Sequence, residues 1–146
     1  MFKRLLVAYD GSEESRKALK IALELASKFG SEVHLLTVID KLPRFAGTVS
    51  EVKQTIERAT AQIEKQHALA HLIAAEHGVE ILCVIQPGSK VEIILNYIEN
   101  KNCDGVLLGY KAHSGLLRTL RRSTALKIVS HPPCTTILAT LQGDYE

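Results

Sequence analysis

Short apolar runs alternate with longer amphipathic stretches along the whole chain. The runs at 3–9, 32–39, 79–85, 105–108 and 136–141 are rich in Val, Ile and Leu and are bounded by turn-forming residues, which predicts five buried strands. The stretches at 13–29, 49–77, 91–97 and 116–129 place apolar residues at helical spacing, which predicts four helices. The first also has Glu13 and Glu14 at its start and Gly30 at its end, as a capped helix does.

This order of elements predicts an α/β fold with a single domain over residues 1–146. Strands that alternate with helices form a parallel sheet, and right-handed crossovers place the helices on both of its faces. We therefore expect an open, five-stranded parallel sheet of the Rossmann-like kind.

In open parallel sheets, ligands bind beyond the carboxyl ends of the strands. The loops after Tyr9, Ile39, Ile85 and Leu108 are thus the places where a site is expected.

The composition is that of an ordinary globular domain, with 46% hydrophobic and 23% charged residues. No apolar run reaches the about 20 residues that cross a bilayer, and the apolar part of the N-terminus is too short for a signal peptide. The three cysteines, Cys83, Cys103 and Cys134, are scattered and lack metal-ligand spacing, so we interpret them as buried thiols in a reducing compartment. We expect a cytoplasmic protein with no membrane partner.

Positive charge is concentrated near the carboxyl end. The net charge of the chain is only +2, and we expect no nucleic acid as a partner. Residues 105–143 contain no Asp or Glu but five cations, which are Lys111, Arg118, Arg121, Arg122 and Lys127. An acid-free loop that enters a helix favours an anion such as phosphate, because free backbone N–H groups and the helix dipole attract negative charge. The alternative is that the arginines form a solvated helix face.

Asp10 and three histidines are further candidate polar residues. Asp10 follows the first strand, where a carboxylate can bind ribose hydroxyls or form a turn that caps the next helix. His67 and His71 have the spacing of two metal ligands, but no third ligand is evident. We interpret both as surface histidines of a long helix and predict no metal site. His113, in the loop after Gly109, can donate to a phosphate or face the solvent.

Motifs of familiar catalytic sites are absent from the sequence. It has no GxxxxGK[ST], no GxGxxG after a strand and no GxSxG. A phospho-acceptor receiver domain needs an aspartate at the end of its third strand, where this chain has Gln86. We find no nucleophile, base and oxyanion donor that could be placed together, and so we predict no dedicated catalysis.

Four segments resemble the universal stress protein family. They are the opening RLLVAYDGS at 4–12, the second strand through Val38, the run CDGVLLG at 103–109 and the stretch HPPCTTIL at 131–138. The resemblance covers nearly the whole chain. It implies a fold like that of the adenine nucleotide alpha hydrolases and a role in the response to stress.

The resemblance also implies a phosphate-binding loop, which this chain has in altered form. In family members that bind nucleotides, the loop after the fourth strand follows G-x2-G-x9-G-[ST]. Here Gly109 and Ser123 match the first and last places, whereas Ala112 and Arg122 replace the two glycines between them. Arg122 either obstructs the phosphates or binds them through its guanidinium group.

By resemblance, the ligand is an adenine nucleotide such as ATP or AMP, with Mg²⁺ only if ATP is bound. Asp10 would contact the ribose, and Val38 would flank the adenine. The phosphate path would be lined by Gly109, Ala112, Ser123 and Thr124, with His113 and Arg122 as further candidates.

The family also tends to dimerise through its last strand. The segment from Thr135 to Leu141 is uncharged and largely apolar, an edge that favours pairing, and we expect a homodimer.

The leading interpretation is a stress-response regulator that holds an adenine nucleotide weakly and does not turn it over. One alternative is a family member that binds no nucleotide and acts through protein contacts. The other is a slow ATP hydrolase.

Overall fold

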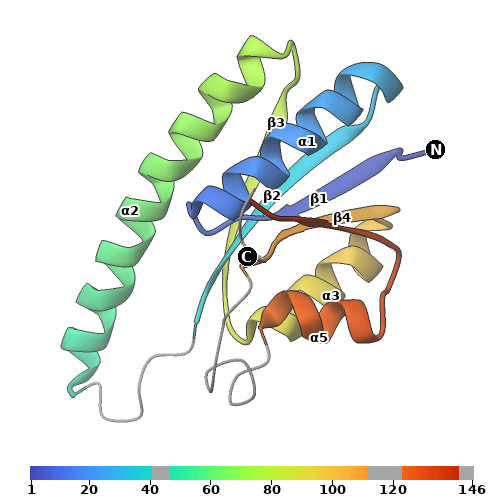
Figure 1. Cartoon of the computed structure of the whole chain (residues 1–146). Coiled ribbons are helices and arrows are strands. Elements are labelled where there is room, and N and C mark those ends of the chain that lie inside the picture. Colours follow the sequence, from blue (N-terminus) through green and yellow to red (C-terminus); the bar gives the residue numbers. More distant parts are fainter. Residues whose placement is uncertain (41–46, 112–122, 142–146) are drawn as a thin grey trace.

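The computed structural model describes residues 1–40, 47–111 and 123–141 of the chain. Within these ranges five strands form one sheet: β1 (Arg4–Ala8), β2 (Glu32–Ile39), β3 (Ile81–Pro87), β4 (Gly105–Gly109) and β5 (Thr135–Ala139). The helices of the same ranges are α1 (Glu13–Phe29), α2 (Val49–Glu76), α3 (Lys90–Lys101) and α5 (Thr124–Ser130), as Figure 1 shows. None of these helices has the length and apolar character that a membrane span requires.

All neighbouring strands of the sheet are parallel, in the order β3-β2-β1-β4-β5. The predicted five-stranded parallel sheet is therefore confirmed. From β1 the chain moves outward through β2 to β3, and it then crosses to the other side of β1 to form β4 and β5. Strand order thus reverses between β1 and β4. Such a reversal leaves a crevice at the carboxyl ends of the two strands.

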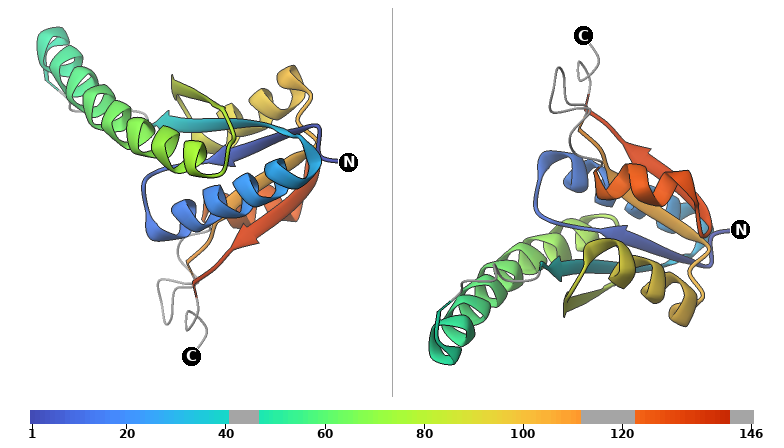
Figure 2. Two further views of the ribbon diagram at one scale, coloured as in Figure 1. Left: turned by 90° about the horizontal axis from the view of Figure 1, so that it is seen from above. Right: turned by 90° about the horizontal axis from the view of Figure 1, so that it is seen from below.

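Helices cover both faces of the sheet, with α1 and α2 on one face and α3 and α5 on the other (Figure 2). Successive side chains of a strand point to opposite faces, which divides the core in two. On β1, Leu5 and Val7 pack with α1, whereas Leu6 packs with α3 and α5. Near its carboxyl end, α2 contacts the sheet through the small buried residues Ala70 and Ala74.

Several element boundaries differ from those predicted, and two of the differences have a clear local cause. The third strand begins at Ile81, not at 79, because the N–H of Val79 bonds to the carbonyl of Ala74 at the end of α2, at 3.0 Å. The third helix extends to Lys101, beyond the predicted end at 97. It stops only where Asn102 adopts a left-handed conformation with φ of 53°.

The three cysteines are free thiols, but only Cys103 is fully buried. Cys83 and Cys134 are half-buried, so the interpretation of all three as buried was wrong for these two. Burial raises the pKa of Cys83 and of Cys103 to about 11. Both groups therefore remain protonated near neutral pH, where a thiol is a poor nucleophile.

Candidate functional site

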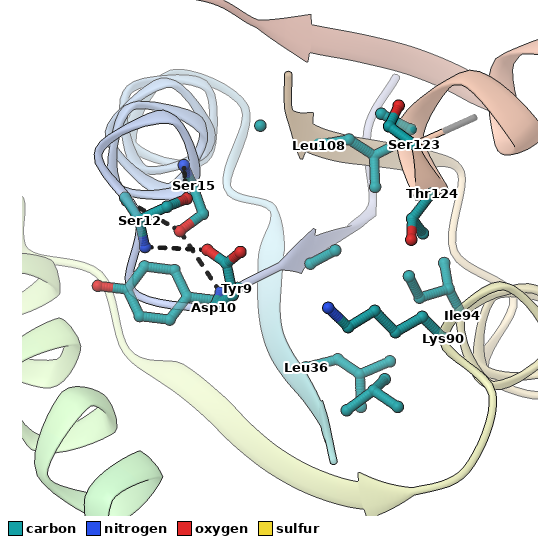
Figure 3. A pocket seen from close by; sticks show the side chains of 14 residues that line it. Tyr9, Asp10, Ser12, Ser15, Leu36, Lys90, Ile94, Leu108, Ser123 and Thr124 are labelled. Carbon is teal, nitrogen blue, oxygen red and sulfur yellow. Dashed lines mark hydrogen bonds between the residues drawn. The ribbon is translucent and has the colours of Figure 1, made fainter. Parts of the chain in front are cut away.

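A pocket opens beyond the carboxyl ends of β1 and β4, where strand order reverses (Figure 3). Its volume is about 210 Å³, several times the ~30 Å³ that one water molecule occupies in the liquid. The wall is partly apolar, with Leu36, Val38, Ile94 and Leu108, and partly polar. A ligand with one flat apolar part and one charged part would suit such a wall.

Five of the residues predicted for the site line this one pocket. Asp10 follows β1, Val38 belongs to β2, Gly109 ends β4, and Ser123 and Thr124 lie at the start of α5. They come from four separate parts of the sequence, and the parallel sheet brings them together. The remaining three candidates, Ala112, His113 and Arg122, lie outside the described residues.

Asp10 is held in a turn by the start of α1. Its Oδ1 accepts the N–H of Ser12 at 2.9 Å, and its own N–H donates to the hydroxyl of Ser15 at 3.4 Å. Partial desolvation raises the pKa of the Asp10 carboxyl, but interactions with Ser12 and Ser15 and the charge of Lys90 outweigh it, so the pKa lies below its ordinary value. Asp10 is therefore an ionised hydrogen-bond acceptor at the pocket wall, as contact with ribose hydroxyls would require.

The turn around Asp10 also explains why α1 begins where it does. The hydroxyl of Ser12 accepts the N–H of Ser15 at 3.2 Å, which caps the helix. Glu13 and Glu14 occupy the first turn, as predicted. The turn that holds Asp10 and the cap of α1 are thus one structure, and both predicted uses of this aspartate are compatible.

Gly109 is required by close packing at the pocket floor. A Cβ atom at this position would lie 2.6 Å from the backbone nitrogen of Ser15 and 2.7 Å from the carbonyl carbon of Glu14. Both are backbone atoms at the start of α1, so they cannot rotate away as a side chain can. The end of β4 therefore approaches α1 in a way that only glycine allows.

Ser123 and Thr124 mark the beginning of α5. Ser123 has an extended backbone, with φ of −66° and ψ of 159°, and its hydroxyl accepts the N–H of Leu126 at 3.1 Å. The prediction of one helix over 116–129 was wrong, because a residue with extended backbone cannot lie inside a helix. Thr124 points into the pocket beside Ile94 (Figure 3).

Lys90 is a pocket residue that the sequence did not indicate. It is the first residue of α3, and its side chain extends into the pocket in the direction of Asp10 (Figure 3). Its Nζ also lies 3.4 Å from the Oδ2 of Asp40, just after β2. The one available signal was its place directly after the turn at Pro87 and Gly88, a loop that the strand pattern had already placed at the site edge.

His67 is buried, and its interpretation as a surface histidine was wrong. It is 5% exposed, and its Nε2 lies 2.8 Å from the hydroxyl of Thr37, which itself donates to the carbonyl of Tyr9 at 2.6 Å. His71 is exposed, as predicted. Among the described residues, no three His, Cys, Asp or Glu side chains gather as a metal site would need.

The sequence of the chain matches a known protein family over most of its length. Residues 1–139 match the universal stress protein family. The chain belongs to that family. The curated relatives include universal stress protein MJ0531 of Methanocaldococcus jannaschii, which is 29% identical over 140 residues and is matched over 82% of its length by 94% of this chain. Universal stress protein YxiE of Bacillus subtilis is 27% identical over 94% of this chain and 99% of its own length.

Solved structures of universal stress proteins share the fold. UspA from Lactobacillus plantarum superposes with a TM-score of 0.82 at 20% identity, over 94% of this chain and 97% of its own. Other similar structures contain adenine nucleotides. A universal stress protein in complex with cAMP has a TM-score of 0.72 at 16% identity, over 94% of this chain and 96% of that one. An Arabidopsis thaliana family member with AMP bound has a TM-score of 0.69 at 15% identity, over 98% and 94%.

Proposed function

We propose that this protein binds an adenine nucleotide, ATP or AMP, in the pocket between β1 and β4 and acts as a stress-response regulator. One observation carries the proposal: Asp10, Val38, Gly109, Ser123 and Thr124, which the family resemblance assigns to nucleotide contact, line a single pocket at the reversal of strand order. The solved relatives with cAMP and AMP support the choice of ligand class.

The pocket lining suits both the apolar and the charged part of a nucleotide. Val38, Leu36 and Ile94 form an apolar wall, against which a purine ring would lose contact with water. Asp10 provides an ionised acceptor at the end of β1 for ribose hydroxyls. Gly109, Ser123 and Thr124 would face the phosphates, together with Ala112, His113 and Arg122 of the altered loop.

Binding, and not turnover, is the proposed purpose of the site. The carboxylate of Asp10 is engaged by the N–H of Ser12, and its lowered pKa makes it a weak base.

A cytoplasmic location is part of the same proposal and is supported by the three free thiols, which are typical of a reducing compartment.

We further infer a homodimer in which β5 pairs with β5 of a second copy. Among the strands of the described residues, β5 is an edge strand that pairs with β4 alone, and residues Thr135–Ala139 carry no charge that would discourage pairing. Light scattering after size-exclusion chromatography tests this inference. The expected mass is twice the 16.1 kDa of the chain, and a monomer at all concentrations would contradict it.

Calorimetry of nucleotide-stripped protein tests the proposed function. AMP, ATP and cAMP are titrated into the wild type, into Asp10→Ala and into Glu24→Gln, a matched control on the exposed side of α1. We expect saturable binding of at least one nucleotide, weakened at least about tenfold by Asp10→Ala, since a hydrogen bond to a charged group contributes about 1.5–3 kcal/mol. Flat titrations with all three nucleotides would instead favour a family member that acts through protein contacts alone.

A further inference from the structure

Lys90 places a positive charge inside the pocket from the start of α3. Its side chain lines the pocket together with Asp10 and Thr124, and Figure 3 shows it extending from the start of α3 in the direction of Asp10. The ammonium group is close enough for its charge to lower the pKa of the Asp10 carboxyl. A cation therefore stands within the space that a ligand would occupy.

The local structure of α3 does not account for a lysine at this position. A cation in the first turn of a helix opposes the helix dipole, so it costs stability there. Ser89, which precedes it, makes no hydrogen bond through its side chain to cap the helix. The ion pair with Asp40 contributes little in return, because the two side chains are 40% and 63% exposed. A residue that destabilises its own helix without a compensating contact nearby is characteristic of a functional site.

The carboxylates near the pocket do not fit a divalent cation. Among the described residues that line it, Asp10 is the one acid. One of its oxygens accepts the N–H of Ser12, and the side chain of Lys90 extends in its direction with a charge that lowers the pKa of the carboxyl. The sequence from 105 to 143, which includes the whole altered loop, has no Asp or Glu. Mg²⁺ in nucleotide sites is held by one or two carboxylates besides the phosphates, and a neighbouring ammonium would repel it.

We propose that the pocket binds the phosphate of its nucleotide without a divalent cation, and that Lys90 supplies the positive charge in the place of the metal. The inference rests on the proposed function, since it concerns the ligand of that same pocket. In the free protein Lys90 pairs with Asp40 at 3.4 Å. When the nucleotide enters, the ammonium exchanges this exposed carboxylate for the phosphate, which carries more charge and is less solvated in the pocket.

The ligand class follows from this arrangement. A nucleotide with a long phosphate chain relies on Mg²⁺ to neutralise its charge, and the one acid of the described pocket lining offers that ion little. The charge of a single phosphate, by contrast, can be matched by one ammonium group. AMP and other monophosphates should therefore bind as well in a chelator as in Mg²⁺. This sets the proposed site apart from one that takes the magnesium complex of ATP as its ligand.

The test compares wild type, Lys90→Met and Lys90→Arg in calorimetric titrations with adenosine, AMP and ATP, each in EDTA and in excess Mg²⁺. Methionine preserves the unbranched stem and helix propensity of lysine but removes its charge. We expect wild type to bind AMP equally in both buffers, Lys90→Met to lose about tenfold in AMP affinity and none in adenosine affinity, and Lys90→Arg to retain most of the AMP affinity.

Each other outcome is decisive. Nucleotide binding by wild type that needs Mg²⁺, or AMP affinity that is unchanged in Lys90→Met, would overturn the inference and leave the proposed function standing. An equal loss of adenosine and AMP affinity in Lys90→Met would overturn it too, because the lysine would then shape the pocket and not bind the phosphate. Wild type that binds none of the three ligands would overturn the proposed function itself.

Discussion

The Nε2 atom of His67 lies 2.8 Å from the Oγ1 atom of Thr37, in the buried contact between α2 and β2. The Thr37 hydroxyl has a single proton, which it donates to the carbonyl of Tyr9 at 2.6 Å. His67 must therefore donate its Nε2 proton to Thr37. This chain of hydrogen bonds connects α2 to the residue directly before Asp10. It secures the end of β1 from which the pocket aspartate projects.

The contact of His67 with Thr37 should contribute measurably to stability. His67→Ala leaves the lone pairs of a buried hydroxyl without a donor, and we expect the free energy of unfolding to fall by about 1–3 kcal/mol. Urea denaturation of His67→Ala, Thr37→Val and the double variant gives the coupling energy between the two side chains, expected at about 0.5–3 kcal/mol. His71→Ala, exposed on the same helix, is the control and should change stability by less than about 0.5 kcal/mol. Strictly additive effects of the two single variants would show that the side chains do not interact.

Buried histidines should make the protein less stable in mild acid. Burial lowers the pKa of His67, and the charge of His71 lowers it further; burial also lowers the pKa of His34. A histidine whose pKa is depressed in the folded state binds fewer protons there than in the unfolded chain, so stability rises with pH. The free energy of unfolding should be constant above the unfolded pKa of about 6.5 and should decline as the pH falls below it. The decline should be shallower in His67→Gln than in the wild type. Equal slopes of the free energy of unfolding against pH in the two proteins would show that His67 is not responsible for it.

Gly109 should be intolerant of any side chain. The Cβ of Gly109→Ala would lie 2.6 Å from a backbone nitrogen of α1, and we expect a loss of about 1–3 kcal/mol because one of the two elements must shift. Gly30→Ala is a matched comparison, since Gly30 has a left-handed φ of 70° but open space around its Cβ. There the cost should be about 1 kcal/mol, from the backbone conformation alone. Gly109→Ala with wild-type stability would mean that β4 does not approach α1 so closely.

Asp40 should compete with the nucleotide for Lys90. Removal of this carboxylate in Asp40→Asn frees the ammonium group, and AMP should bind up to about fivefold more tightly, since an exposed ion pair contributes about 0–1 kcal/mol. The same substitution made in Lys90→Met should leave the AMP affinity of that variant unchanged. Weaker AMP binding by Asp40→Asn would indicate that the pair holds Lys90 in the binding position.

The sheet and most of its helices could be predicted from the sequence, because their signals are local. The apolar runs of β1 and β2 are buried in their central residues, 5–7 and 33–37, so the sequence pattern alone identified them. The start of α5 was missed because its capping residue, Ser123, follows a stretch with helical spacing. A helix is capped where the backbone of one residue is extended, and the spacing of apolar residues does not reveal that conformation.

The parts of the site that could not be predicted depend on contacts between distant residues. His67 follows charged and polar residues on a helix that is otherwise largely exposed, and its burial depends on distant partners, the hydroxyl of Thr37 and the ring of Tyr9. From the sequence alone, Lys90 would be interpreted as an ordinary solvated residue at a helix start. It becomes a pocket residue only because α3 begins by the end of β2, at the same edge of the sheet as the end of β1, a consequence of strand order and not of local sequence.

A crystal structure of the protein grown with AMP in the presence of EDTA tests the central claim most directly. We expect AMP in the pocket between β1 and β4, with a ribose hydroxyl within hydrogen-bond distance of the Asp10 carboxylate and the phosphate beside the ammonium group of Lys90. AMP bound elsewhere on the molecule, or an empty pocket at a saturating concentration of AMP, would contradict it.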